Sequence, residues 1–219
     1  VIAVYTHTGL LSANLIQAWV AAAQVAITGD FAPHWGNAVL RYVPPGGAID
    51  ADEWQLVFFD HSDQAQALGY HNVTAAGLPI LKVFIADCLA DAANWNVTAL
   101  HEVYEAIADP FIDRTVTFGG WEYALEVADA PEDDQYAVRI AGHMASNAVT
   151  PAWFKPDGVA PFTIYPCASI TKPFELAPGG YIGRRQLPDG QWEQQLGVGA
   201  RSARQVKRPT SRTMRRFGA

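Results

Sequence analysis

The sequence predicts an α+β fold with a small mixed sheet, a long N-terminal helix, a second helix in mid-chain and a loop-rich C-terminal half. Three observations favour this class. Apolar residues recur at helical spacing between positions 12 and 28. Short β-rich runs lie on both sides of a second helical segment, which a proline stops at position 110. From Thr150 onward, prolines, glycines and aromatic residues dominate, a composition typical of irregular structure.

The composition is that of a packed globular protein. Half of the 219 residues are hydrophobic, 17% are charged and seven are tryptophan, which excludes a disordered or fibrous chain. A chain of this length can bury the core of one domain. We expect a single domain over residues 1–197 and a basic tail over residues 198–219.

The first quarter of the chain predicts a strand, a helix and two further strands. Residues 1–5 are rich in β-formers. Ser12 can cap a helix that runs to about Thr28 and that Gly29 ends. Its apolar positions are Leu15, Ile16, Trp19, Val20, Ala23 and Ile27. We expect a loop over residues 31–36, and strands over residues 37–43 and 54–60.

The middle of the chain predicts another strand, the second helix and a set of short strands. The strand covers residues 80–86 and a loop follows over residues 87–96, where Asn94 or Asn96 can cap the helix. After Pro110, short strands are predicted over residues 115–118, 123–127 and 136–140. Ala141, Gly142 and His143 predict a tight turn into one more strand.

The second helix carries the chemistry. It places His101 and Glu105 on one face, because residues four apart lie one above the other, whereas Glu102 points about 100° away. This is the layout of a zinc-peptidase helix in which glutamate replaces the second histidine. A helix can also carry such residues with His101 simply hydrogen-bonded to a carboxylate. On either interpretation the helix packs through Val97, Leu100, Tyr104 and Ile107.

A metal centre on this helix needs a ligand from elsewhere, because a catalytic zinc ion takes three protein ligands. Glu126 follows closely enough for a compact domain to bring it back, and Asp129, Asp109 and Asp113 are close rivals. Zinc is the expected ion, with Glu102 as the general base toward its bound water. The many carboxylates also suit calcium or manganese.

The other reactive residues indicate no second site. His71 and His143 are isolated in sequence from other ligands, so we assign them turn or core roles. Cys88 and Cys167 lie far apart without a CxxC context, which favours reduced, buried thiols. The chain has no nucleophile elbow, Walker loop or dinucleotide fingerprint, which argues against nucleotide chemistry.

Charge is distributed unevenly. The net charge is −7, yet residues 198–219 hold seven basic residues and no acidic one, which leaves −14 on residues 1–197. Such a tail suits an acidic protein surface, another copy of the chain or nucleic acid phosphate. We find no uninterrupted apolar run long enough for a bilayer and no signal peptide. We therefore expect a chain made and kept in a cytosol, with no membrane partner.

An ordered series of motifs resembles a little-characterised group of phage and prophage proteins. The motifs are HEVYEAIADP (101–110), LEVAD (125–129), VTPAWF (149–154), PGGY (178–181) and FAPHWG (31–36). The HExxE helix and the Glu-(Val/Ile)-Ala-Asp that follows also look like those of phosphate-induced, exordium-type proteins, which have a zincin-like signature. The likeness covers most of residues 10–197. The chain departs from the phage group at Ala128 and Ala130, near which we expect a cysteine and a proline, and in its basic tail.

The resemblance implies a zincin-like α+β fold with metal ligands His101, Glu105 and Glu126, Asp129 as a further candidate, and Glu102 as the would-be base. It also implies a virion-associated structural or assembly protein, made in the cytoplasm of a bacterial host. Its basic tail would tether it to a neighbouring subunit or to nucleic acid. The alternative is an active zinc metallopeptidase. A third interpretation is a carbohydrate- or surface-binding module that uses the aromatic residues of positions 153–181.

Overall fold

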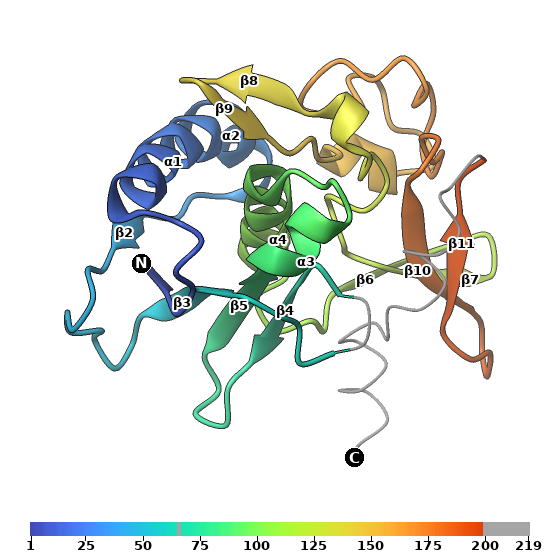
Figure 1. Ribbon diagram of the computed structural model, residues 1–219. Helices are drawn as coiled ribbons and strands as arrows, with labels where there is room; N and C mark the ends of the chain where they lie inside the picture. The colour runs from blue at the N-terminus through green and yellow to red at the C-terminus, as the bar shows by residue number, and fades with distance from the viewer. Residues whose placement is uncertain (65–66, 199–219) are drawn as a thin grey trace.

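The computed structural model describes residues 1–64 and 67–198. A central layer of helices lies between a five-stranded sheet on one side and loops and short strands from the second half of the chain on the other (Figure 1). This arrangement confirms the mixed α+β class. The predictions about the basic tail fall on residues 199–219, which lie outside the described residues.

The first sheet is mixed and has the strand order β2-β1-β3-β5-β4. Its strands are β1 (Ile2–Thr6), β2 (Leu40–Tyr42), β3 (Trp54–Phe59), β4 (Gly69–Val73) and β5 (Pro79–Phe84). Within this sheet β4 pairs antiparallel with β5, at the edge, and the other pairs are parallel. All but β4 overlap predicted strands. The sequence does not predict β4, because Gly69, His71 and Asn72 are poor β-formers.

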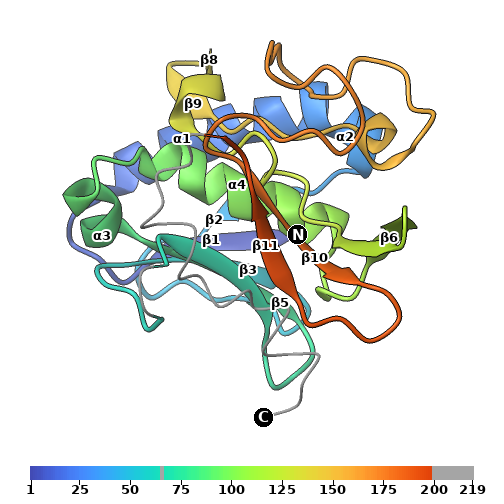
Figure 2. The same ribbon diagram turned by 90° about the vertical axis from the view of Figure 1, so that its right-hand side faces the viewer.

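Helices cover one face of this sheet, as two perpendicular views show (Figures 1 and 2). Helix α1 (Ala13–Ala26) begins where predicted, since the Ser12 hydroxyl oxygen accepts a hydrogen bond from the Leu15 N–H at 3.3 Å. It continues through a π-helical turn, η1 (Ile27–Phe31), into α2 (Ala32–Trp35). The prediction of a loop over residues 31–36 is therefore wrong. Ile27 and Phe31 are fully buried, and their packing outweighs the helix-breaking tendency of Gly29.

By length and composition, the helical stretch Ala13–Trp35 could cross a membrane. The sequence prediction considered only uninterrupted apolar runs, which Gln24 breaks. The finding is weak evidence, because core helices pass the same test. Ile16 and Trp19 on this helix are buried within the hydrophobic core.

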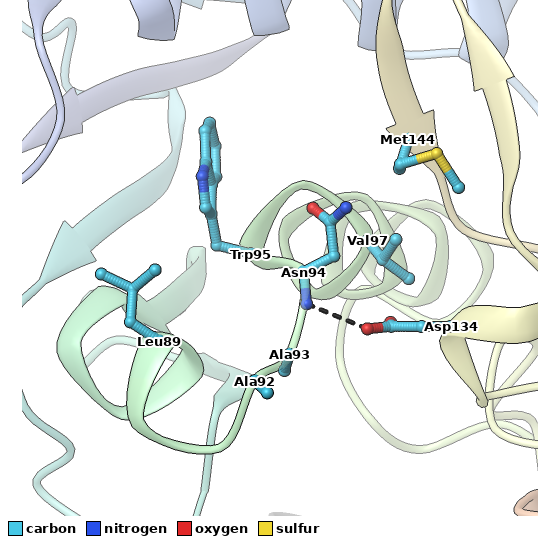
Figure 3. Close-up of a pocket in the computed structure, with 8 residues that line it drawn as sticks. All are labelled: Leu89, Ala92, Ala93, Asn94, Trp95, Val97, Asp134 and Met144. Atoms are coloured by element: carbon cyan, nitrogen blue, oxygen red, sulfur yellow. Dashed lines mark hydrogen bonds between the residues drawn. The ribbon is translucent and has the colours of Figure 1, made fainter.

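Helix α4 (Trp95–Ala108) packs on β4 and β5 and is buried along nearly its whole length. Asn94 caps it, as predicted, by accepting the Asn96 N–H at 3.1 Å, and the helix ends before Pro110. The backbone N–H of Asn94 itself donates to the Asp134 carboxylate at 2.9 Å (Figure 3). A short helix, α3 (Ile85–Ala90), replaces the first part of the expected loop over residues 87–96.

The second half of the chain forms an antiparallel sheet of order β11-β10-β7-β6 and a separate β8-β9 hairpin. The elements are β6 (Thr115–Phe118), β7 (Trp121–Ala124), η2 (Asp134–Tyr136), β8 (Val138–Ile140), β9 (His143–Ala145), η3 (Pro151–Phe154), β10 (Tyr181–Gln186) and β11 (Glu193–Leu196). The predicted turn at Ala141 and Gly142 joins β8 to β9. Residues 155–180 are irregular, as expected. The sequence predicts neither β10 nor β11. The residues of β11 are polar, and β10 is held in place by its pairing with β7.

The aromatic motifs pack around α4. Phe31 stacks on Tyr104 with ring centroids 4.1 Å apart, and the Trp35 indole N–H donates to the Val149 carbonyl at 2.7 Å. The interpretation as a binding module required exposed rings between positions 153 and 181. Phe174 is half-buried against Phe118 and Tyr123, and the other rings are buried, namely Trp153, Phe154, Phe162, Tyr165 and Tyr181. These side chains stabilise the core around the central helix and offer no binding platform.

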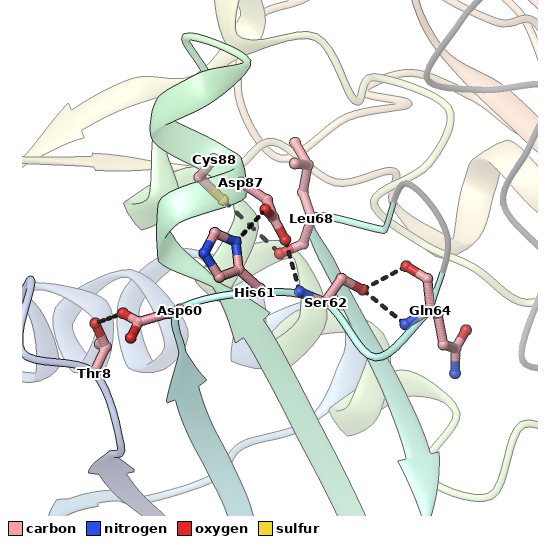
Figure 4. A network of polar contacts seen from close by, with 8 residues as sticks. All are labelled: Thr8, Asp60, His61, Ser62, Gln64, Leu68, Asp87 and Cys88. Carbon is pink, nitrogen blue, oxygen red and sulfur yellow. Dashed lines mark hydrogen bonds and ion pairs between the residues drawn. The ribbon is translucent and has the colours of Figure 1, made fainter.

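A polar network connects the carboxyl ends of β1 and β3 to α3 (Figure 4). Thr8 donates its hydroxyl hydrogen to Asp60. The Ser62 N–H donates to Asp87 at 2.7 Å, and Nδ1 of the exposed His61 lies 3.0 Å from the same carboxylate. These contacts fix the turns at one edge of the sheet.

Candidate metal centre

Helix α4 carries three ionisable side chains into the protein interior. His101, Glu102 and Glu105 have exposed fractions of only 3% to 5%. Burial of charge at this level is costly unless the groups are paired or bind a metal ion. The partners of these three side chains therefore determine what the helix can do.

The first partner is Asp129, in the segment that follows β7. The His101 Nε2 lies 3.3 Å from the Glu105 Oε1 and 3.3 Å from the Asp129 Oδ1. Ligand atoms of these three residues all lie within 4.8 Å of one another. The structure thus brings together two residues of the helix motif and one of the candidates for a third ligand.

The second partner is His71, on the edge strand β4. Its Nδ1 lies 3.5 Å from the Glu102 Oε2 and 3.7 Å from the Glu105 Oε2. His71, Glu105 and Glu126 form a second group whose ligand atoms lie within 4.8 Å of one another. The turn or core role assigned to His71 from sequence is therefore incomplete, because this residue faces the acidic side chains of α4. A prediction of β4 would have placed Gly69 and His71 on the face toward α4.

The rival ligand candidates lie elsewhere. Asp109 is fully buried and accepts the backbone N–H groups of Asp113 and Arg114, so it fixes the chain that leaves α4. Asp113 is exposed. The Nδ1 of His143 lies 3.3 Å from the Asn96 side-chain oxygen, toward the other end of the helix. None of these three belongs to either group of possible metal ligands found among the described residues.

The PGGY motif fixes the segment that bears Asp129. The Tyr181 N–H donates to the Asp129 carbonyl at 3.0 Å. A side chain at Gly180 would place its Cβ 1.9 Å from the Ala130 carbonyl oxygen, so only glycine allows this approach. On the other side, the Val149 N–H donates to the Val127 carbonyl at 2.8 Å. Two later motifs of the sequence thus position the predicted ligand segment.

The buried groups shift one another's pKa values. Burial, and then the Asp129 carboxylate, raise the pKa of Glu105 well above its ordinary range. Burial also raises the pKa of Asp129 to about 6, against the opposing influence of His101. Burial by itself would lower the pKa of His101, but Glu105 and Asp129 outweigh it and raise that pKa well above its usual value. Side chains that retain protons in this way can exchange them for a metal ion.

The distances fit a tetrahedral ion. Ligand atoms bound at 2.0–2.2 Å to one tetrahedral zinc ion lie about 3.4 Å apart, close to the separations of 3.3 Å around His101. Within the described part of the chain, the buried Glu105 Oε1 has no hydrogen-bond partner, and a buried polar atom without a partner is costly. A zinc ion bound among these side chains would satisfy it, so the residues present fit the expected metal.

The cluster is closed to solvent. The exposed fractions of His71, His101, Glu102, Glu105, Glu126 and Asp129 lie between 2% and 8%. An open groove of about 520 Å³ lies instead at the start of α4, lined mainly by apolar residues such as Leu89, Trp95 and Met144 (Figure 3). None of the six buried side chains lines this groove. A bound metal ion would therefore be enclosed by protein.

Known proteins provide no independent guide to this cluster. No family model, curated protein or solved structure matches the chain. Its chemistry is therefore inferred from the six buried side chains and their arrangement.

Proposed function

We propose that the chain is a zincin-like metal-binding domain with a structural or assembly role in a phage virion. The observation that supports it best is the closed cluster in which His101, Glu105 and Asp129 meet, with Glu126 beside them. A catalytic zinc ion keeps one position for water or substrate, and the burial of these side chains gives solvent little access to such a position. A mixed sheet with the metal-motif helix packed across its β4 edge is compatible with the zincin-like fold expected from the sequence motifs.

The donor set favours zinc, with manganese as the next candidate. Imidazole nitrogens suit zinc, whereas calcium takes oxygen ligands almost exclusively. His101 lies within ligand distance of Glu105 and Asp129, so at least one nitrogen belongs to the site. We therefore propose zinc as the resident ion and place calcium last.

Metal analysis of the purified full-length chain tests the metal-binding part of the proposal. We expect bound zinc in a fixed ratio to protein, lost in Glu105→Gln and retained in the exposed control variant His34→Gln. Circular dichroism of both variants separates loss of metal from loss of fold. A metal-free wild-type protein that is fully folded would contradict the proposal.

The virion role has its own test. The body of the chain is strongly acidic and the tail of residues 198–219 is basic, so the tail is the segment suited to an acidic subunit surface or to nucleic acid. Deletion of residues 198–219 should abolish incorporation into particles. Replacement of the tail by a neutral segment of equal length is the matched control for chain length. Unchanged incorporation of the deleted chain would exclude tethering by the tail.

The second candidate is an active metallopeptidase, and the position of Glu102 favours it. Its carboxylate lies beside His71 and against the backbone of Gly69, where an added Cβ would come within 2.9 Å of the Glu102 Oε1. When bound, zinc polarises a carbonyl and makes its water acidic. Glu102 would then accept the proton from that water.

The edge strand β4 has backbone groups with which a peptide substrate could pair. The Phe84 N–H donates to the Leu68 carbonyl and the Thr74 N–H to the Leu78 carbonyl. Because hydrogen-bonded pairs alternate in an antiparallel ladder, the N–H and C=O groups of Gly69 point away from β5, as do those of His71. An extended peptide could pair with them by β-augmentation. Both residues are buried, so a substrate would reach this edge only after a movement of the covering chain.

The peptidase alternative is tested by one substitution. Glu102→Gln should keep the metal and abolish cleavage of a peptide library, because the amide cannot act as a base. Glu105→Gln, which should lose the metal, is the comparison. Absence of cleavage by the metal-loaded wild-type chain would exclude the alternative without affecting the structural proposal.

A further inference from the structure

Glu105 directs its two carboxylate oxygens toward two different histidines. The Oε1 lies 3.3 Å from the His101 Nε2, and the Oε2 lies 3.7 Å from the His71 Nδ1. The two histidines come from separate elements, α4 and β4. A carboxylate placed between two imidazoles can bind one cation through each oxygen.

We propose that the cluster holds two divalent metal ions bridged by Glu105. The first is bound by His101, Glu105 and Asp129, as in the proposed function on which this inference rests. The second is bound by His71, Glu105 and Glu126, and the Glu102 carboxylate lies next to His71. Two-metal sites have ions about 3.5–4 Å apart, a spacing that one bridging carboxylate accommodates.

The geometry of the second group supports a separate ion. Ligand atoms of His71, Glu105 and Glu126 lie within 4.8 Å of one another, as they do in the first group. The His71 Nδ1 lies 3.5 Å and 3.7 Å from oxygens of Glu102 and Glu105. These separations are long for hydrogen bonds but close to the spacing of about 3.4 Å between ligands of one tetrahedral ion.

His71 provides an observation that does not depend on the acidic residues. Its side chain is 2% exposed, and its Nε2 has no hydrogen-bond partner among the residues that the structure describes. The contacts that orient this buried imidazole are therefore those of its Nδ1, which faces the carboxylates of Glu102 and Glu105 and is the nitrogen placed to bind the second ion. The Oε1 of Glu105, in the same cluster, also lacks a hydrogen-bond partner in residues 1–64 and 67–198.

The acidic character of the cluster is compatible with a second ion. When ionised, Glu102, Glu105, Glu126 and Asp129 place four negative charges in the interior. The ion pairs of Glu102, Glu105 and Asp129 within the described residues are all with histidines, which bind metals in the neutral form. Two divalent ions would carry as much positive charge as these four carboxylates carry negative charge. Unbalanced buried charge is strongly destabilising.

Titration of the metal-free full-length chain with Mn²⁺ tests the inference. We expect about two ions per chain by equilibrium dialysis. Electron paramagnetic resonance should show the signal of isolated Mn²⁺ weakening as the second ion binds, because a shared carboxylate couples the two spins. His71→Gln should bind about one ion with an uncoupled signal, while the exposed control variant His34→Gln should bind two.

Each outcome separates the two proposals. A single ion in the wild-type chain overturns the second site and leaves the proposed metal-binding function intact. No bound ion overturns both. Two ions without spin coupling contradict the bridge through Glu105. If His71→Gln does not fold, the ion count and the coupling of the wild-type chain decide the question.

Discussion

Gly180 sets the position of the segment that carries Asp129. An added Cβ would lie 1.9 Å from the Ala130 carbonyl oxygen and 3.1 Å from that of Asp129. Gly180→Ala should therefore displace this segment and destabilise the protein by about 1–3 kcal/mol, as overpacking in cores does. Urea denaturation measures the stability, and metal analysis should show weaker retention.

Gly9→Ala is the matched control for Gly180→Ala. Gly9 is exposed, and an added Cβ would meet nothing within 4 Å. It should change stability by less than about 0.5 kcal/mol. Equal stability of the two variants would show that the close approach at Gly180 is unimportant.

Arg41 holds Glu53 in its ionised form. Its hydrogen bonds, together with the Asp50 N–H, lower the pKa of Glu53 to about 2. The pKa of glutamate in an unfolded chain is about 4.3, so the carboxylate stabilises the fold above that pH, and the contribution is lost as the pH falls toward about 2. Glu53→Gln should therefore lower the free energy of unfolding at neutral pH and have a much smaller effect near pH 2. Chemical denaturation at several pH values measures this.

The exposed neighbour Asp52 supplies the control for Glu53. Asp52→Asn should change the free energy of unfolding little at either pH. A cost of Glu53→Gln that stays constant down to pH 2 would contradict the role assigned to the Arg41 contact.

Helical spacing on α4 was sufficient to identify His101, Glu102 and Glu105 as candidate site residues. Distance along the chain suggested Glu126 and Asp129, but it could not rank them against Asp109. Asp109 is also buried, but its carboxylate accepts backbone N–H groups at the end of α4. The sequence could not identify His71 as a member of the cluster. Pairing of β4 with β5 brings this residue there, and strand pairing is a non-local property.

The contribution of the N-cap of α4 to stability can be tested directly. The Asn94 Oδ1 accepts the Asn96 N–H at 3.1 Å. Asn94→Ala should destabilise the protein by about 1 kcal/mol, the usual cost of losing an N-cap. Asn94→Asp keeps an acceptor oxygen at the same position, and its stability in urea should stay near that of the wild type. A similar loss in both variants would mean that the cap contributes little.

Local patterns explain which elements could be predicted. Apolar spacing and the caps Ser12 and Asn94 located α1 and α4. The prolongation of α1 depends on burial of Phe31 against Tyr104, a contact between distant segments. β4 and β11 are polar and short, so tertiary pairing rather than composition defines them.

For the whole molecule, the candidate centre connects the two halves of the chain. It brings together β4, α4 and the segment after β7, which β10 in turn holds through the Tyr181 N–H. Binding of metal to the folded state alone should stabilise it by about 2.7 kcal/mol at a free concentration 100 times the dissociation constant, or roughly 5–10 °C in Tm for a chain of this size. Calorimetry of metal-free and metal-loaded protein measures this shift.

Glu105→Gln is the reference for the thermal shift, since it should lose the metal. Its Tm should not respond to added zinc, whereas that of His34→Gln should respond as the wild type does. An equal rise in Glu105→Gln would place the stabilising metal outside the cluster.

The backbone contact between Tyr181 and Asp129 has a consequence for biosynthesis. His71 leaves the ribosome long before Asp129, and the last of the backbone hydrogen bonds that position the Asp129 segment forms only after Tyr181 has been added. Stable uptake of metal should therefore begin late in translation, and nascent chains that end before Tyr181 should lack it. In the cell, metal content would then distinguish completed chains from truncated ones.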